Sequence, residues 1–319
     1  MSEPNQTLWP TLNYSTYRKT GEALHLWSQI IGKLRLASTP WINHSWHATL
    51  YVTPRGLSTG LFHQDAISLS VELDFQDHCL VAVTGTGQRK TMALEDMSVA
   101  TFHDRLREMI HELGGTFDIH GAPNEIPDGI AFAQDTTVRP YSTTDAAALH
   151  QALVQIERVF SQFRTGFLGK VSPVHLFWGS FDLAVTRFSG RTAPRHPGGI
   201  PKLPDAITWE AYSHEVSSAG FWPGGGGIDE AMFYSYAYPV PEAFHAQSVK
   251  PAAARWDDGL GEFLLPYEAV RTSDNPAETL LAFLNSTYEA AASTAGWDRE
   301  ALECGIQKAR VPRPVDEQA

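Results

Sequence analysis

The stretch Ile67-Ser68-Leu69-Ser70-Val71-Glu72-Leu73-Asp74-Phe75 alternates strictly between apolar and polar side chains. Because successive side chains of a strand point to opposite faces of a sheet, this pattern predicts a half-buried β-strand. Shorter strands at about 79–84 and 89–94 flank the Gly-Thr-Gly turn at 85–87. Together with a strand expected at 46–53, they predict an antiparallel meander.

Helical patterns lie on both sides of this meander. Apolar residues recur at three- and four-residue steps over 14–37 and again over about 144–166. Ser98 and Gly114 are suited to begin and end a helix between them. The segment from Asn275 has a capping residue followed by Pro276 and has Glu278 at the third helical position, which predicts a last helix.

The second half of the chain, like the first, combines a predicted meander of strands with helices, so the sequence predicts an α+β fold. A strand near 116–120 closes the first half, and a helix opens the second. We expect antiparallel meander sheets in two possibly related halves, 14–142 and 143–305, packed with four to five helices in one globular α+β domain over 1–305. The polar segment 306–319 is expected to be a flexible tail. Strands are expected in the aromatic-rich second half at 173–188, 208–218, 231–238 and 261–269.

Composition and charge exclude several classes of partner. The 319 residues are 43% hydrophobic and 19% charged, which is the composition of a folded domain. A formal charge of −12 repels phosphate groups, so we expect neither nucleic acid nor a membrane as partner. With only two cysteines, Cys79 and Cys304, and no signal-like N-terminus, the sequence predicts a cytoplasmic protein.

Several familiar site motifs do not occur in the sequence. The glycine run 224–227 is followed by Ile-Asp-Glu, so it is no Walker loop, and no GxGxxG, GxSxG or HExxH sequence is found. The segments 190–204 and 224–227 are instead expected to be long loops, which either border a site or cross the surface.

Histidines supply the first candidate site residues. His44 and His47 lie in Asn43-His44-Ser45-Trp46-His47, where one helical turn would bring both rings to one side. Two imidazoles need a carboxylate or a third histidine to complete a metal site, and Glu268 is a candidate for that place. The alternative is that both rings only form hydrogen bonds to the backbone or stack on Trp46.

A second group is embedded in the apolar segment 172–182, which contains His175 and Asp182. A buried unpaired charge costs several kcal/mol, so these groups need partners. They either line a functional pocket or form ordinary core hydrogen bonds, for example between Asp182 and Arg187 or Arg191. An arginine here could also hold an anionic substrate group through a bidentate contact.

A third group is Tyr212-Ser213-His214-Glu215. Neighbours diverge in a strand, so Ser213, His214 and Glu215 form no local triad, but His214 beside Tyr212 suits acid–base chemistry. The alternative is a core histidine tied to a carbonyl. Tyr234, Tyr236 and Tyr238 share one strand face, which suits either a ligand wall or cross-strand packing. Glu262 is a further late carboxylate.

Several of these stretches together resemble a bacterial family catalogued only as a domain of unknown function and typified by a cyanobacterial structural-genomics protein. The resemblance covers about Trp9 to Glu303 and implies an α+β protein, without implying a reaction, cofactor or catalytic residue. The stretches that carry it are Leu24–Lys33, Asn43–His47, Ser172–Arg191, Ala211–Gly224 and Gly261–Arg271.

Our hypothesis from the sequence is an enzyme that acts on a small polar or aromatic molecule at a His/carboxylate site. The sequence does not identify a cofactor, and a divalent metal is compatible with this site. The alternative is a non-catalytic small-ligand-binding protein with an aromatic-lined cavity, and a structural or assembly protein is a third interpretation. A homo-oligomer is compatible with all three. The expected catalytic residues are His175, His214, Asp182, Glu215 and Arg187, and the expected metal ligands are His44, His47, His175, His214 and Glu268.

Overall fold

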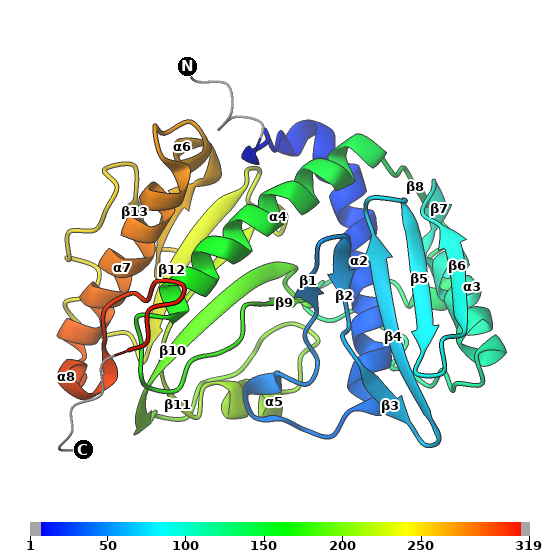
Figure 1. Cartoon of the computed structure of the whole chain (residues 1–319), viewed down its shortest axis with the longest axis horizontal. Helices are drawn as coiled ribbons and strands as arrows, with labels where there is room; N and C mark the ends of the chain where they lie inside the picture. Colours follow the sequence, from blue (N-terminus) through cyan, green and yellow to red (C-terminus); the bar gives the residue numbers. More distant parts are fainter. Residues whose placement is uncertain (1–7, 314–319) are drawn as a thin grey trace.

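The alternating stretch forms β4 (Ile67–Asp74) in the first of two antiparallel sheets of the computed structural model, which describes residues 8–313 (Figure 1). Leu69, Val71 and Leu73 are fully buried on one face of β4, as the period of two predicts. The strand order is β1-β2-β4-β5-β6, and β3 also pairs with β4. The remaining strands are β1 (Tyr51–Val52), β2 (Gly56–Ser58), β3 (Phe62–Gln64), β5 (Cys79–Thr84) and β6 (Arg89–Ala93).

The second sheet has six strands in the order β13-β14-β12-β11-β10-β9, and every pair of neighbours is antiparallel. Its long central strand β10 (Asp182–Thr192) pairs over most of its length with β11 (His214–Trp222). The α+β prediction is therefore confirmed. The other strands are β9 (His175–Phe177), β12 (Met232–Tyr238), β13 (Arg255–Asp257) and β14 (Glu262–Pro266), and a separate two-stranded ladder joins β7 (Met97–Ser98) to β8 (Val138–Arg139).

Four long α-helices begin at capping residues that the sequence supplies. The side chains of Asn13, Ser98, Ser142 and Asn275 each accept a hydrogen bond from the first turn of the helix that follows. The long helices are α2 (Tyr14–Ser38), α3 (Val99–Glu112), α4 (Thr143–Arg164) and α7 (Pro276–Thr294); the short ones are α5 (Asp205–Ala211), α6 (Tyr267–Arg271), α8 (Arg299–Leu302) and the 3₁₀ turns η1 (Asn43–Ser45) and η2 (Phe132–Gln134).

Helices cover one face of the second sheet, and irregular segments cover the other. Figure 1 shows α4 and α7 lying across the same face, which we call the inner face. Leu183 and Val185 of β10 are fully buried there, in a hydrophobic core that also includes residues of α2 and of the first sheet. The opposite, outer face is covered by η1, α5 and loops, and it carries the polar residues described below. No helix within residues 8–313 is long and apolar enough to cross a membrane.

Five of the expected strands differ from the structure. One of them, 261–269, ends with β14 and continues into α6. The expected strand 46–53 forms only at β1, because His44 and Ser45 have φ values of 58° and 59° and turn the chain. The segment 173–188 is a hairpin of β9 and β10 rather than one strand, and the first part of 208–218 is α5.

No strand forms at 116–120. Both polar groups of the Thr116 backbone bind the Gln64 side chain, at 2.9 Å each, instead of a neighbouring strand. The division of the chain near residue 142 stays a prediction. Residues 314–319 of the expected tail lie outside the described residues.

Gly32 allows α2 to approach β9 closely, and this contact can be tested. A Cβ on Gly32 would lie 2.1 Å from Cδ1 of Trp178, whose Nε1–H is fixed by a 2.6 Å hydrogen bond to the Ala48 carbonyl. Gly32→Ala gains about 1 kcal/mol of helix propensity. Overpacking costs about 1–3 kcal/mol, so we expect a net loss in the free energy of unfolding, measured by urea denaturation.

Gly121→Ala is the matched control, since a Cβ there would meet nothing within 4 Å. If Gly32→Ala were as stable as the parent, Trp178 would be free to move and the contact would not fix the position of β9.

Candidate functional site

The outer face of the second sheet carries a layer of polar side chains. Thr186 of β10 lies opposite Ser218 of β11, which in turn lies opposite Tyr236 of β12. The next pairs towards the Asp182 end are Ala184 with Gly220 and Gly220 with Tyr234. Because residues directly opposite each other share a face, the hydroxyl groups and the Asp182 carboxyl lie on one side of the sheet.

Asp182 is a buried carboxyl group held only by hydroxyl donors. Its side chain is 4% exposed, and it accepts hydrogen bonds from the hydroxyl groups of Ser180 and Tyr234. No cationic side chain of the described chain pairs with it. Burial raises the pKa of Asp182, and the two hydroxyl donors only partly offset that rise.

Two glutamates on other elements surround Asp182. Burial, followed by the charge of Asp182, raises the pKa of Glu125 to about 7 and that of Glu262 to about 8. One oxygen of Glu262 is buried and has no hydrogen-bond partner among residues 8–313. Both glutamates are only half-buried, so solvent reaches this side of the cluster. We call Glu125, Asp182 and Glu262 the carboxyl cluster.

Two glycines leave room for the carboxyl cluster. A Cβ on Gly179 would lie 1.9 Å from Oε1 of Glu125, and a Cβ on Gly220 would lie 2.2 Å from the hydroxyl oxygen of Tyr234. Distances this short are impossible between real atoms. Any larger residue at either position would therefore displace the carboxyl of Glu125 or the hydroxyl that binds Asp182.

Tyrosines continue the layer away from the carboxyl cluster. The hydroxyl groups of Tyr212 and Tyr236 are hydrogen-bonded at 2.9 Å. The His196 ring stacks on Tyr212 with 4.7 Å between centroids, and Tyr238 donates to the Pro194 carbonyl. Burial raises the pKa of Tyr212 to about 12, so this phenol is a neutral hydrogen-bond donor at physiological pH.

Two loops are joined to each other beside this layer. The Glu125 N–H donates to the Pro201 carbonyl at 3.1 Å, and the Asn124 side chain donates to the Lys202 carbonyl at 2.5 Å. Lys202 Nζ returns a 2.9 Å hydrogen bond to the Gly129 carbonyl. The loop 190–204, expected as a candidate site border, therefore holds the segment that carries Glu125.

His44 holds α5 against the outer face. Its Nδ1 lies 2.9 Å from the Ala211 carbonyl at the end of α5, and Lys170 Nζ lies 2.5 Å from its Nε2. The His44 backbone N–H donates to Glu210 of α5 at 2.7 Å, which accounts for the unusual backbone conformation here. Both ring nitrogens are occupied, and burial lowers the pKa of the ring.

The other three candidate histidines, His47, His175 and His214, share no hydrogen-bond partner among the described residues. His47 Nδ1 accepts from the Ile42 N–H at 3.1 Å, and His214 Nδ1 lies 3.0 Å from the Ser213 hydroxyl. The centroids of the His44 and His214 rings are 6.1 Å apart. His175, beside Trp46 and Phe177, is 1% exposed, and neither of its ring nitrogens has a partner in the described part of the chain.

The remaining predicted residues do not join Asp182. Arg187 points to the inner face, where its guanidinium carbon lies 3.5 Å from the centroid of Phe163. The expected hydrogen bond from Arg187 or Arg191 to Asp182 is therefore wrong, because odd spacing along β10 puts Arg187 on the opposite face and Arg191 pairs with Glu215 at 2.7 Å. Glu268 is exposed and pairs with Arg271.

No group of three or more His, Cys, Asp or Glu side chains within residues 8–313 is arranged to hold a metal ion. The divalent metal expected from the histidines thus stays a prediction that this part of the chain does not support.

Sequence reasoning identified Asp182, weighed Glu262 and found the face shared by the tyrosines, but it missed Glu125. That residue lies in an irregular segment and had no periodic or motif signal.

Comparison with known proteins gives a family but no reaction. The model described as "Family of unknown function (DUF5996)" matches residues 9–304. No curated protein matches the chain, and no solved structure does. The chemistry of the site therefore has to be argued from its geometry.

The carboxyl cluster predicts a particular dependence of stability on pH. Unfolded glutamates titrate near the ordinary value of 4.5, whereas folded Glu125 and Glu262 titrate at about 7 and about 8. The folded state binds more protons between these values, so the cluster's contribution to stability falls as pH rises from about 5 to about 8. Glutamine imitates the protonated group, so we expect the Glu125→Gln/Glu262→Gln variant to lose less stability over this range than the parent.

The measurement is the free energy of unfolding in urea at several pH values. Glu108→Gln, an exposed glutamate on α3, is the matched control and should follow the parent. Parallel curves for the parent and the double variant would show that these carboxyls titrate normally.

His175 generates a second stability prediction. A buried polar group without partners costs about 1–3 kcal/mol. Replacing the ring with one of similar shape, in His175→Phe, should therefore leave the free energy of unfolding unchanged or raise it by about that amount. A large loss would show that His175 has a partner, such as an ordered water molecule, which the variant removes.

Proposed function

The chain belongs to the family of unknown function DUF5996, and we propose from its geometry that it is an enzyme which performs acid–base chemistry on a small polar or aromatic molecule at the carboxyl cluster. One observation carries this proposal: Glu125 and Glu262, from two separate elements, both lie beside the buried Asp182, and partial burial together with its charge raises their pKa values to about 7 and about 8. A group whose pKa lies near the working pH can both give and take a proton during a reaction.

Each residue of the cluster has a distinct proposed role. Glu125 is the general acid–base group, since its pKa of about 7 is closest to neutral pH and its side chain is half-buried. Asp182, held by Ser180 and Tyr234, is a positioning residue whose charge adds to the effect of burial in raising the pKa of Glu125. Glu262 has a pKa of about 8 and is mostly protonated at neutral pH, so its proposed role is to donate a hydrogen bond to the bound molecule.

The tyrosine layer favours a second candidate function, binding without catalysis. The rings of Tyr212 and Tyr236 offer flat apolar surface next to hydroxyl groups, which suits a ligand that is partly aromatic and partly polar. Both candidates place the ligand on the outer face. They differ in whether the bound molecule changes chemically.

The location and assembly of the protein remain part of this proposal. We place it in the cytoplasm, which the free thiols of Cys79 and Cys304 support. A homo-oligomer stays a prediction that light scattering during gel filtration checks.

The test is a thermal-shift screen against small polar and aromatic molecules at pH 6 and pH 8, repeated on Asp182→Asn and Glu125→Gln. We expect a ligand that raises the melting temperature of the parent and of the control Glu108→Gln by several degrees, with at least half of that shift lost in both site variants. Asparagine and glutamine keep the shape of the side chains and remove the titrating proton.

Proton NMR of each ligand after incubation with the protein then separates the two candidates. A new product formed by the parent and not by Glu125→Gln supports the enzyme, and an unchanged ligand supports the binder. If a ligand raised the melting temperature equally in the parent and in both site variants, the ligand would not bind at the outer face.

A further inference from the structure

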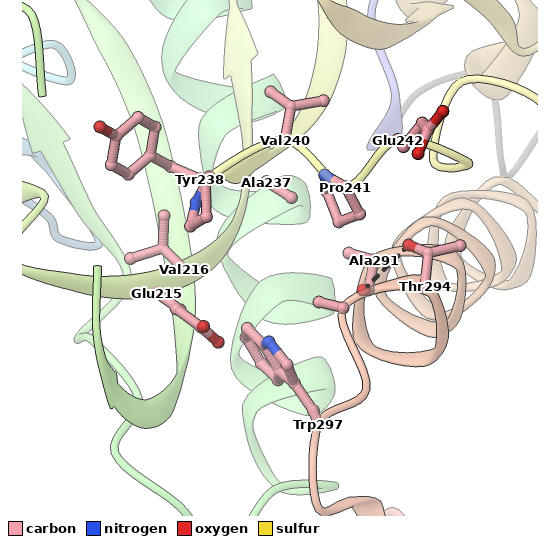
Figure 2. Close-up of a pocket in the computed structure, with 12 residues that line it drawn as sticks. Glu215, Val216, Ala237, Tyr238, Val240, Pro241, Glu242, Ala291, Thr294 and Trp297 are labelled. Atoms are coloured by element: carbon pink, nitrogen blue, oxygen red, sulfur yellow. Dashed lines mark hydrogen bonds between the residues drawn. The ribbon is translucent and has the colours of Figure 1, made fainter. Parts of the chain in front are cut away.

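A separate cavity lies at the end of the second sheet, on the side of α7. Its volume is about 200 Å³, and it is bordered by the start of β11, the end of β12, the segment 239–242 and the C-terminus of α7 (Figure 2). Pockets for drug-sized ligands are about 300–1000 Å³, so this cavity suits a molecule of a few heavy atoms. Its walls are mostly apolar and include Val216, Ala237, Pro241 and Ala291.

The only charged side chains that line this cavity are acidic. Glu215 and Glu242 both border it, and no lysine or arginine among the described residues does. One oxygen of Glu215 accepts hydrogen bonds from Ser189 and Arg191, at 2.7–2.9 Å. Glu242 is exposed and has neither an ion pair nor a hydrogen bond within residues 8–313. Arg191 neutralises Glu215, so Glu242 supplies the one uncompensated charge among the described residues that line the cavity.

The end of α7 adds to this negative potential. Thr294 and Ala295 line the cavity at the C-terminus of the helix, where the helix dipole places partial negative charge. The same helix end already binds one cation, because the Arg191 guanidinium donates to the carbonyls of Ala295 and Gly296 at 2.8 Å and 3.1 Å. These contacts show that this end of the helix stabilises positive charge, and that Arg191 already occupies two of its carbonyls.

An aromatic ring completes the cavity. Trp297 is 7% exposed, and Figure 2 shows its ring and the Glu215 carboxylate facing each other at one end of the cavity. Indole faces attract cations, and apolar walls attract short alkyl chains. We propose that this cavity binds a small organic cation, a primary alkylammonium group on a short apolar chain.

This site is independent of the proposed function. Glu215 lies on the inner side of the second sheet with Arg191, whereas the carboxyl cluster lies on the outer face. None of the cluster residues Glu125, Asp182 and Glu262 lines the cavity. Either site can therefore fail its test without affecting the other.

The test is an NMR titration of the full-length protein, followed at the indole N–H resonance of Trp297. The probes are n-butylammonium, n-butanol and butyrate, which share one alkyl chain and differ in charge. We expect n-butylammonium to bind at least about tenfold more tightly than n-butanol, and butyrate to bind more weakly still.

Glu242→Gln is the informative variant, because this exposed residue has no partner to lose and the fold should be unaffected. We expect it to weaken n-butylammonium binding about two- to tenfold, which corresponds to an interaction of about 0.5–1.5 kcal/mol between partly exposed charges, and to leave n-butanol binding unchanged. Glu108→Gln is the matched control. Equal affinities for n-butylammonium and n-butanol, no effect of Glu242→Gln, or no shift with any probe would each overturn the proposal.

Discussion

Because a β-strand has two faces, the alternation of side chains along β10 determines how the rest of the second sheet is used. The odd-numbered side chains of β10 point towards α4 and α7; they are Leu183, Val185 and Arg187. The even-numbered side chains point away, and they include Asp182, Thr186 and Phe188. The inner face can be covered by regular helices because it is mainly apolar. The outer face buries a carboxyl group and several hydroxyl groups, so whatever covers it has to supply hydrogen bonds.

Irregular chain covers the outer face, and the Pro194 carbonyl supplies one such bond by accepting from the Tyr238 hydroxyl. The side chains of a helix can reach the sheet, but its backbone groups are already paired within the helix. The segments 121–130 and 194–204 and the turn η1 have backbone groups to spare, and they use them on each other and on α5. The conformation of His44 and Ser45 belongs to this arrangement, since it directs the His44 N–H towards Glu210. Local strain of this kind needs surrounding contacts that fix it.

Local patterns predicted the fold well, and contacts between distant residues were what they could not predict. The alternation at 67–75 and the capping residues at Ser98 and Asn275 gave elements within a residue or two of those in the structure. The strand expected at 46–53 forms only at β1, after a turn at His44 whose N–H binds Glu210, far away in the sequence. A contact of this kind produces no pattern in the sequence near His44 from which it could be predicted.

The same distinction applies to the candidate site. Asp182 could be identified, because a carboxylate within an apolar strand conflicts with its surroundings. Glu125 could not, since nothing in an irregular polar segment distinguishes one glutamate from another. Arg187 was placed with Asp182 by proximity in sequence, yet the two lie five positions apart along β10, and an odd offset puts them on opposite faces of the sheet. The histidines were predicted to be metal ligands or acid–base groups because imidazole commonly has these roles. In the structure, His44 instead binds the end of α5.

Gly179 and Gly220 have a consequence for comparing this chain with its relatives. Each glycine occupies the place where a larger residue would collide with Glu125 or with Tyr234. In a homologue with all three acidic residues but with alanine at either position, the cluster would still align in sequence, while the Glu125 carboxyl or the Tyr234 hydroxyl would have to move. The two glycines, which carry no functional group, are therefore a better diagnostic of whether a relative shares this site than the acidic residues alone.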